Sequence, residues 1–175
     1  MTFSHATGQY NVLGTLYAWL QGALTGNKPP LLSSVTLVVE NPQDPMGNAT
    51  LPCYSVHYLG ADTGPSPYQG GRVDDGSGEQ KFGIVEVNAW ATRRDANWRA
   101  QLAQMQDALT KAVISLRSTG SALIIKDFYT NAAAPSNVSY RIVIDRVEAR
   151  TPPYDPNPDI ERRRMLLYFS WIERA

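Results

Sequence analysis

The side chains that most often perform catalysis are scarce in this sequence. It holds one cysteine, Cys53, and two histidines, His5 and His57. Cys53 and His57 lie four residues apart in a segment that alternates like a strand, which places them on one face but about 13 Å apart. A nucleophile must lie within hydrogen-bond reach of its general base, so these two side chains cannot form a local pair. We expect a buried thiol and a half-buried imidazole.

The usual sequence signatures of catalysis and nucleotide binding are also absent. The sequence has no Gly-x-Ser-x-Gly, no Gly-x-x-x-x-Gly-Lys-Ser/Thr, no Gly-x-Gly-x-x-Gly and no His-x-x-x-His. A single cysteine excludes a disulfide framework, and with two histidines it excludes a zinc site built from Cys and His within one chain. We therefore predict no catalytic, cofactor-binding or metal-binding residues.

One acidic segment could still hold a divalent cation. Asp74, Asp75 and Glu79 are interleaved with glycines, and calcium accepts several carboxylates from a flexible loop. The spacing differs from that of an EF-hand and favours a solvated acidic loop. If the fold grouped these carboxylates with His57, they could instead line the pocket of a small ligand-binding domain or enzyme, which stays open as an alternative function.

Length and charge indicate one domain with part of its surface covered. The 175 residues, 43% of them hydrophobic, suffice for a single domain over 1–175. Sixteen basic residues balance sixteen acidic ones, so a polyanionic partner is not required. The first sixty residues carry only Lys28, Glu40 and Asp44, which indicates burial in the core or against other subunits. The absence of a leader-like or membrane-spanning run predicts a soluble protein.

Hydrophobic periodicity predicts two helices and six strands. The helices are expected over 10–24 and from a cap at Asp95 to Gly120. The strands are expected at 33–40, 51–59, 81–92, 123–127, 138–148 and 164–172, the first two pairing across a turn at 43–48. Residues 60–80, rich in Gly, Pro, Ser and Asp, predict an extended loop or hairpin insertion. The order predicts an α+β fold in which two α-helices pack on one face of an antiparallel or mixed β-sheet.

Several residues are candidates for subunit contacts. Trp19 is expected to be exposed on the polar side of the first helix, and aromatic residues are enriched in interface cores. The second helix should present Arg99, Gln101, Gln104, Gln106 and Lys111 to solvent. The arginine clusters, with Asp95, Asp159 and Glu161 nearby, favour ion pairing at a surface or subunit boundary over contact with passing DNA. The candidate interface residues are Trp19, Tyr68, Arg72, Arg93, Arg94, Arg162 and Arg163.

One strand and the helix after it suggest a family. Residues 82–91 read Phe-Gly-Ile-Val-Glu-Val-Asn-Ala-Trp-Ala, and an arginine-rich turn and an Ala/Gln/Leu helix begun by Asp-Ala-Asn-Trp follow at once. Together with a helix and a strand pair before them and a strand pair after them, these segments resemble the tail terminator and tail completion proteins of long-tailed bacteriophages. The resemblance covers nearly the whole chain.

The resemblance implies a structural virion protein rather than an enzyme. Such a protein forms a ring, commonly a hexamer, that caps the tail tube, stops its polymerisation and offers an attachment face to the head or neck. Its partners would be further copies of itself, the tail tube protein and a neck or head-completion protein. DNA would pass through the lumen without specific binding, and no cofactor or membrane would be involved.

The implied location is the head-proximal end of the virion tail, after assembly in the host cytoplasm. The alternative within the same class is a neck, head-completion or connector ring of a phage or phage-like injection machine.

Overall fold

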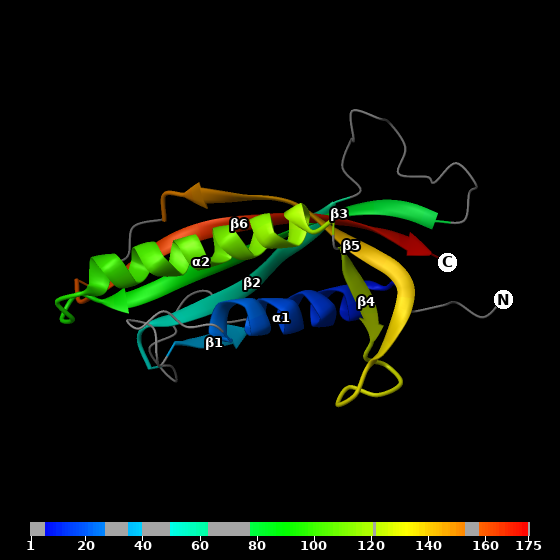
Figure 1. Ribbon diagram of the computed structural model, residues 1–175, viewed down its shortest axis with the longest axis horizontal. Helices are drawn as coiled ribbons and strands as arrows, with labels where there is room; N and C mark the ends of the chain where they lie inside the picture. The colour runs from blue at the N-terminus through cyan, green and yellow to red at the C-terminus, as the bar shows by residue number, and fades with distance from the viewer. Residues whose placement is uncertain are drawn as a thin grey trace.

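Two helices lie in one layer against a curled six-stranded sheet (Figure 1). The computed structural model describes residues 6–26, 35–39, 50–62, 78–120, 122–152 and 158–174. In chain order the elements are α1 (Gln9–Thr25), β1 (Thr36–Val39), β2 (Cys53–Asp62), β3 (Gly78–Thr92), α2 (Trp98–Ser118), β4 (Leu123–Asp127), β5 (Ser136–Arg150) and β6 (Ile160–Arg174). The sheet order is β1-β2-β3-β6-β5-β4. The predicted α+β fold is therefore confirmed, and its sheet is mixed.

The centre of the sheet is the antiparallel pair of β3 and β6. It runs without a register shift from Gly78 opposite Arg174 to Thr92 opposite Ile160. Both strands are longer than the sequence predicts, because β3 begins at Gly78 and β6 at Ile160. Such a long ladder satisfies its backbone groups internally and leaves both strands central in the sheet.

The first two strands pair as predicted, but they run parallel and so do not form a hairpin. β1 pairs with β2 in parallel, with Thr36 opposite Cys53, and a parallel pair requires a crossover connection rather than a tight turn. The proposed turn at 43–48 lies outside the described residues. The extended loop or hairpin insertion predicted at 60–80 has strand residues at both ends, since β2 continues to Asp62 and β3 starts at Gly78. Residues 63–77 lie outside the described residues.

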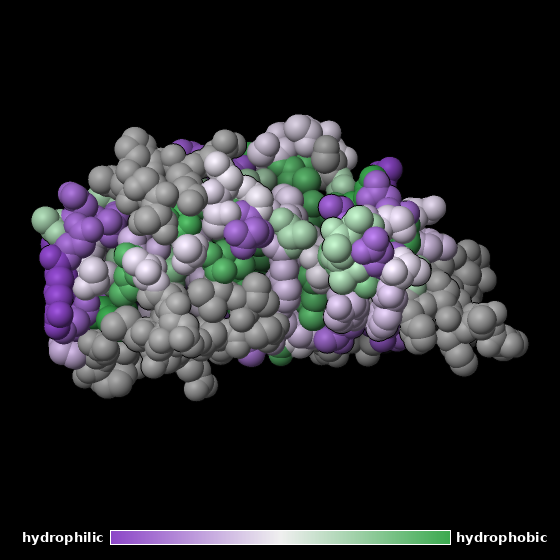
Figure 2. Space-filling view, turned by 90° about the horizontal axis from the view of Figure 1, so that it is seen from below, coloured by the Kyte–Doolittle hydropathy of each residue, from purple (hydrophilic) through white to green (hydrophobic). Residues whose placement is uncertain are grey.

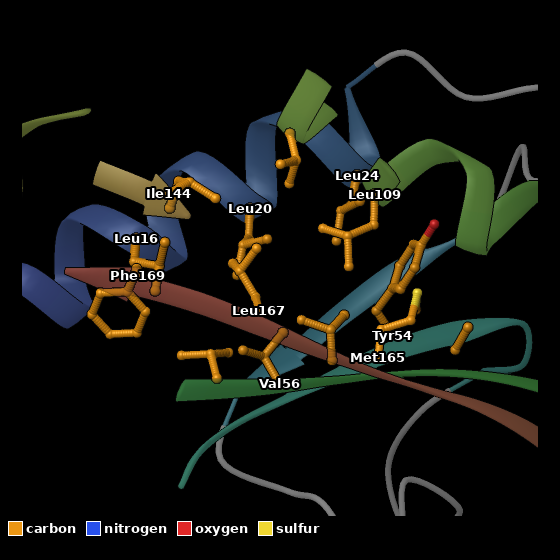
Figure 3. Close-up of a cluster of buried hydrophobic side chains, with 14 of the residues drawn as sticks. Leu16, Leu20, Leu24, Tyr54, Val56, Leu109, Ile144, Met165, Leu167 and Phe169 are labelled. Carbon is orange, nitrogen blue, oxygen red and sulfur yellow. The ribbon is translucent and has the colours of Figure 1, made fainter. Parts of the chain in front are cut away.

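The core lies between the helices and the inner face of the sheet. Val12, Leu16, Leu20 and Leu24 form the buried stripe of α1, and Leu102, Met105, Leu109 and Val113 form that of α2. In Figure 3, Leu16 and Leu20 lie above Phe169 and Leu167 of β6. Each such side chain contributes about 1.5–3 kcal/mol when fully buried. Packing therefore holds α1 in place, even though the helix has no acidic first turn and no basic last turn.

The start of α2 differs from the prediction. Its N-cap is Asn97 rather than Asp95. Asp95 lies before the helix, where its Oδ1 accepts the N–H of Asn97 at 2.9 Å and its Oδ2 accepts a hydrogen bond from Gln101 at 2.8 Å. Gln101 is buried rather than solvated, and this bond pairs its amide nitrogen. Gly120 follows the helix with φ +61°, as a closing glycine should.

A test of the core concerns Gly83, which lies opposite Phe169 in the ladder. A methyl group at this position would overlap the buried Phe169 ring, so we expect Gly83→Ala to lower the free energy of unfolding by about 1–3 kcal/mol. Urea denaturation measures this change. Gly22→Ala is the control, because nothing lies within 4 Å of the added group, and it should be neutral or stabilising by up to about 1 kcal/mol. Equal effects of both substitutions would contradict this packing.

Candidate functional site

Of the residues that might have formed a catalytic site, the two that the structure describes, His57 and Glu79, do not meet. His57 lies opposite Glu86 on β3. Glu79 comes seven residues before Glu86 on that strand, which places it roughly 23 Å from Glu86. Glu79 instead binds Lys81 Nζ at 2.7 Å. Asp74 and Asp75 lie outside the described residues. No cluster of three or more metal-ligating side chains occurs among the residues that the structure describes.

Cys53 is buried, as predicted. It packs with Trp90 and Ile160 in a small second cluster on the face of the sheet away from the helices. Burial raises the pKa of its thiol to about 11. A thiol with this pKa is almost entirely protonated at neutral pH and is a poor nucleophile.

Arg93 and Arg94 lie at the turn between β3 and α2 and are ion-paired to the start of β6. Arg93 Nη2 lies 2.5 Å from Glu161 Oε2, and Arg94 pairs with Asp159. The backbone N–H of Arg93 also donates to the Asp159 carbonyl at 2.8 Å. Asp95, the acidic neighbour of these arginines in the sequence, is instead hydrogen-bonded at the start of α2. The pairs therefore join two segments far apart in the chain.

Side chains alternate along a strand, so Arg163 of β6 lies on the opposite face from Arg162 and Arg164. Arg162 lies over the Trp90 ring at 5.1 Å. Two nitrogens of Arg164 lie 2.7 Å from Glu86 Oε2. Arg163 is exposed. The three guanidinium groups therefore do not face a common groove of the kind that phosphate binding would require.

The Glu86–Arg164 pair is the least exposed ion pair among the described residues. The Glu86 side chain is 9% exposed and that of Arg164 is 28% exposed. Glu86 Oε1 also accepts a hydrogen bond from Asn88 at 2.8 Å, and Trp90 nearby on the same strand donates to Ser55 at 2.8 Å. Polar side chains thus cross-link β2, β3 and β6 on the face that the helices do not cover.

Trp19 is half-buried rather than exposed, because it packs against the core. It lines a groove of about 760 Å³ between α1 and α2. The other lining residues are mostly small or polar: Ala23, Gln104, Asp107, Ala108, Lys111, Ala112, Ser115, Leu116 and Thr119. The other two candidates, Tyr68 and Arg72, lie outside the described residues.

An exposed pair of aromatic residues is not among the candidates predicted from the sequence. Tyr10 at the start of α1 and Tyr129 after β4 are 56% and 59% exposed. Their ring centroids are 5.0 Å apart. We call Tyr10 and residues 128–135 together the tyrosine turn. The available signal was a run without charge, since residues 128–140 contain no Asp, Glu, Lys or Arg.

Hydrogen bonds fix the tyrosine turn to α1. Asp127 Oδ1 accepts the N–H of Tyr129 at 2.9 Å and a hydrogen bond from Asn11 at 3.3 Å. Its Oδ2 accepts the hydroxyl of Thr130 at 3.2 Å. Asn11 Oδ1 in turn accepts the N–H of Phe128 at 2.8 Å. The buried Asn11 thus connects helix and turn.

The same region of α1 also occupies two backbone donors at one edge of the sheet. β4 is an outermost strand, and outermost strands expose N–H groups that can pair with another chain. Thr15 Oγ1 accepts the N–H of Lys126 at 2.8 Å, beside the bond from Phe128 to Asn11. These donors are therefore not available to an added strand.

A second cavity, of about 580 Å³, lies on the sheet near the start of β3. We call it the sheet groove. Its apolar lining includes Leu59, Phe82, Ile84 and Tyr168, and its polar lining includes Asp145 and Arg146. Partial desolvation raises the pKa of Asp145, and a hydrogen bond with Ser170 opposes the rise. Arg146 lies 4.2 Å from the Tyr168 ring centre and binds Glu148 at 2.7 Å.

Comparison with known proteins gives distant structural likeness and no sequence family. No protein-family model and no curated protein matches the chain. Among solved structures the chain is similar to a chain described as "Virion of native gene transfer agent (GTA) particle", with a TM-score of 0.43 and 16% identity. The match covers 94% of this chain and 99% of that one. A likeness at this level carries no argument about function. Among the described residues, no helix is long and apolar enough to cross a membrane.

The contribution of the half-buried Glu86–Arg164 pair to stability can be compared with that of the exposed Arg94–Asp159 pair. Arg164→Ala leaves Glu86 without its charge partner, so we expect a loss of about 3 kcal/mol in the free energy of unfolding. Arg94→Ala removes an arginine whose side chain is 78% exposed and should cost less than about 1 kcal/mol. Urea unfolding compares the two variants. A loss from Arg94→Ala as large as that from Arg164→Ala would refute the ranking.

The turn gives a pH-dependent prediction. The N–H of Tyr129, with smaller help from Asn11 and Thr130, holds the pKa of Asp127 below its ordinary 3.8. The Asp127 carboxylate is therefore protonated less readily in the folded state than in the unfolded state. Its contribution to the stability of the fold is complete above pH 3.8 and is lost as the pH falls through the lowered pKa of Asp127.

Asp127→Ala should accordingly be less stable than the wild type at pH 7, and the difference should shrink at pH 2. Thermal unfolding across this range measures both variants, with Asp107→Ala on an exposed face of α2 as the control. A stability difference that grows as the solution becomes acidic would contradict the assignment.

Proposed function

We propose that this chain is a structural protein of a phage-like virion and acts as a tail terminator. Copies would form a ring, in the family commonly a hexamer, that caps the tail tube, stops its polymerisation and provides an attachment face for the head or neck. The specific role comes from the resemblance of residues 82–91 and the following helix to tail terminator proteins. In this proposal the chain acts by shape and needs neither a cofactor nor catalysis.

The observation that carries an assembly role is the uncharged outer face of α1. None of its 17 residues is charged, although Gln9, Tyr10, Ala18, Gln21 and Gly22 are exposed. Solvated helix faces normally carry charged residues. An exposed face without them is best explained by another protein that covers it in the assembled particle.

The distribution of exposed apolar residues supports contacts on more than one side. Tyr10, Leu59, Ile114, Ile124, Tyr129 and Val143 are the large hydrophobic residues exposed among those described. Figure 2 shows the hydrophobic surface of one side as separate patches among polar ones. A ring of identical subunits needs two different contact surfaces on each copy, and separated patches satisfy this need.

In such a ring, arginines 93, 94, 162 and 163 would lie at subunit boundaries or line the lumen. The protein has zero formal net charge, which suits a passage that DNA traverses without tight binding.

The decisive experiment measures assembly and tube capping together. We expect light scattering over a concentration series to give the mass of a ring, or of a monomer that forms rings on purified tail tubes, with negative-stain images showing rings at tube ends. Addition of the protein to polymerising tube protein should stop elongation. A strict monomer without affinity for tubes would refute the proposal. A ring that ignores tubes and binds neck components would favour the connector alternative.

A matched pair of variants tests the uncharged helix face. Ala18→Lys places a charge on the exposed face of α1, and we expect loss of rings or of tube binding with little change in melting temperature. Ala103→Lys places the same charge on an exposed position of α2 and should leave assembly intact. Equal effects of the two variants would remove the support that the uncharged face gives.

A further inference from the structure

We infer that the ring contact is formed by the tyrosine turn of one subunit seated in the sheet groove of the next copy. The inference rests on the proposed ring and names the two surfaces that make it. Neither surface includes the arginine clusters that the sequence analysis selected as candidates.

The tyrosine turn has the properties of a preformed docking element. Tyr10 and Tyr129 expose more than half of their surfaces, and tyrosine is among the residues that contribute most to binding. The turn is already fixed by Asn11 and Asp127, and Asn131 Oδ1 accepts the N–H groups of Ala133 and Ala134 at 3.0 and 3.1 Å. Binding would therefore order few groups, which reduces its entropic cost.

The Phe128 ring of the turn packs against α1 at Gly14, where the helix has no side chain. A methyl group on Gly14 would lie 2.9 Å from two atoms of the Phe128 ring. The ring thus packs directly on the helix backbone, as it can only where the residue lacks a side chain. Phe128 is the inner anchor of the turn, and the neighbouring Tyr129 faces solvent.

The sheet groove is chemically complementary to this element. Leu59, Ile84 and Phe82 offer an apolar floor for the tyrosine rings, and Leu59 is 45% exposed in the isolated chain. Asp145 adds a carboxylate that can accept a hydrogen bond from a tyrosine hydroxyl. The turn itself carries no charge that would be buried unpaired against this floor.

The two surfaces are separated within one copy, so the contact must be between copies. The turn ends where β5 begins at Ser136, and Asp145 lies nine residues along that strand, roughly 30 Å in extended backbone. Contacts between different surfaces on identical subunits are head-to-tail, and they close into a ring when the rotation permits.

Mixing of two variants provides the test. The turn variant combines Tyr10→Ala with Tyr129→Ala, and the groove variant is Leu59→Arg. Each alone should reduce the fraction of ring at least tenfold while circular dichroism and melting temperature stay close to wild type. Mixed in equal amounts, they should form a dimer and nothing larger, because the pair retains one intact turn and one intact groove. Where rings form only on tubes, the same mixture should fail to stop tube elongation.

A control variant separates this contact from general loss of apolar surface. Ile114→Arg changes a residue on α2 that is 59% exposed and belongs to neither the tyrosine turn nor the sheet groove, so rings should persist whether or not the variant still binds tubes. Disulfide formation gives a direct readout. A mixture of Tyr129→Cys and Leu59→Cys proteins should cross-link between copies, whereas Tyr129→Cys mixed with Ile114→Cys should not. The native Cys53 is buried and does not compete.

The outcomes distinguish this inference from the proposed function. Rings that persist in both the turn and the groove variants refute the contact and leave the terminator role standing. Rings that persist while tube binding is lost also refute it, since the turn would then dock a different protein. A wild-type protein that neither assembles nor binds tubes refutes the role and the contact together.

Discussion

The structure depends on the register of the long β3–β6 ladder. Odd-numbered residues of both strands, such as Val87 and Leu167, face the helices, and even-numbered residues such as Glu86 and Tyr168 lie on the other face. A shift by one residue would exchange these two sets. It would place the Glu86 carboxylate under the helices and remove Phe169 from the position opposite Gly83. One register therefore defines both the hydrophobic core and the sheet groove.

A second constraint is the polar junction between α1 and β4. Asn11 and Thr15 are buried on a helix whose other buried residues are apolar, and an unpaired polar group there would cost roughly 1–3 kcal/mol. Both are instead satisfied by backbone donors of Lys126 and Phe128. These hydrogen bonds position α1 relative to the edge of the sheet, and they thereby orient the turn that carries Tyr129.

The helices and strands that follow a regular hydrophobic pattern can be predicted from the sequence, whereas contacts between distant residues cannot. The two helices and β3 follow from strict periodicity, and Gly120 ends α2 as expected. The direction of β1 relative to β2 depends on a crossover connection and has no periodic signal. The burial of Gln101 requires the Asp95 contact six residues away. The tyrosine turn depends on residues 117 apart, Asn11 and Phe128, so its rigid form could not be predicted, although its lack of charge was visible in the sequence.

The junction at β4 also bears on how copies can associate. An open outermost strand allows repeated strand addition, which has no natural end. Here the N–H groups of Lys126 and Phe128 are already bonded to α1, so the end of β4 offers fewer backbone donors to an added strand, and side-chain contacts are favoured there. A side-chain contact fixes an angle between two rigid copies, and a fixed angle between unlike surfaces can close into a ring of limited size. The same two helix residues that cover the edge also hold the turn in place. The occupied donors at the end of β4 and the exposed turn held by hydrogen bonds thus have one structural cause, and both suit a subunit whose proposed task is to end polymerisation.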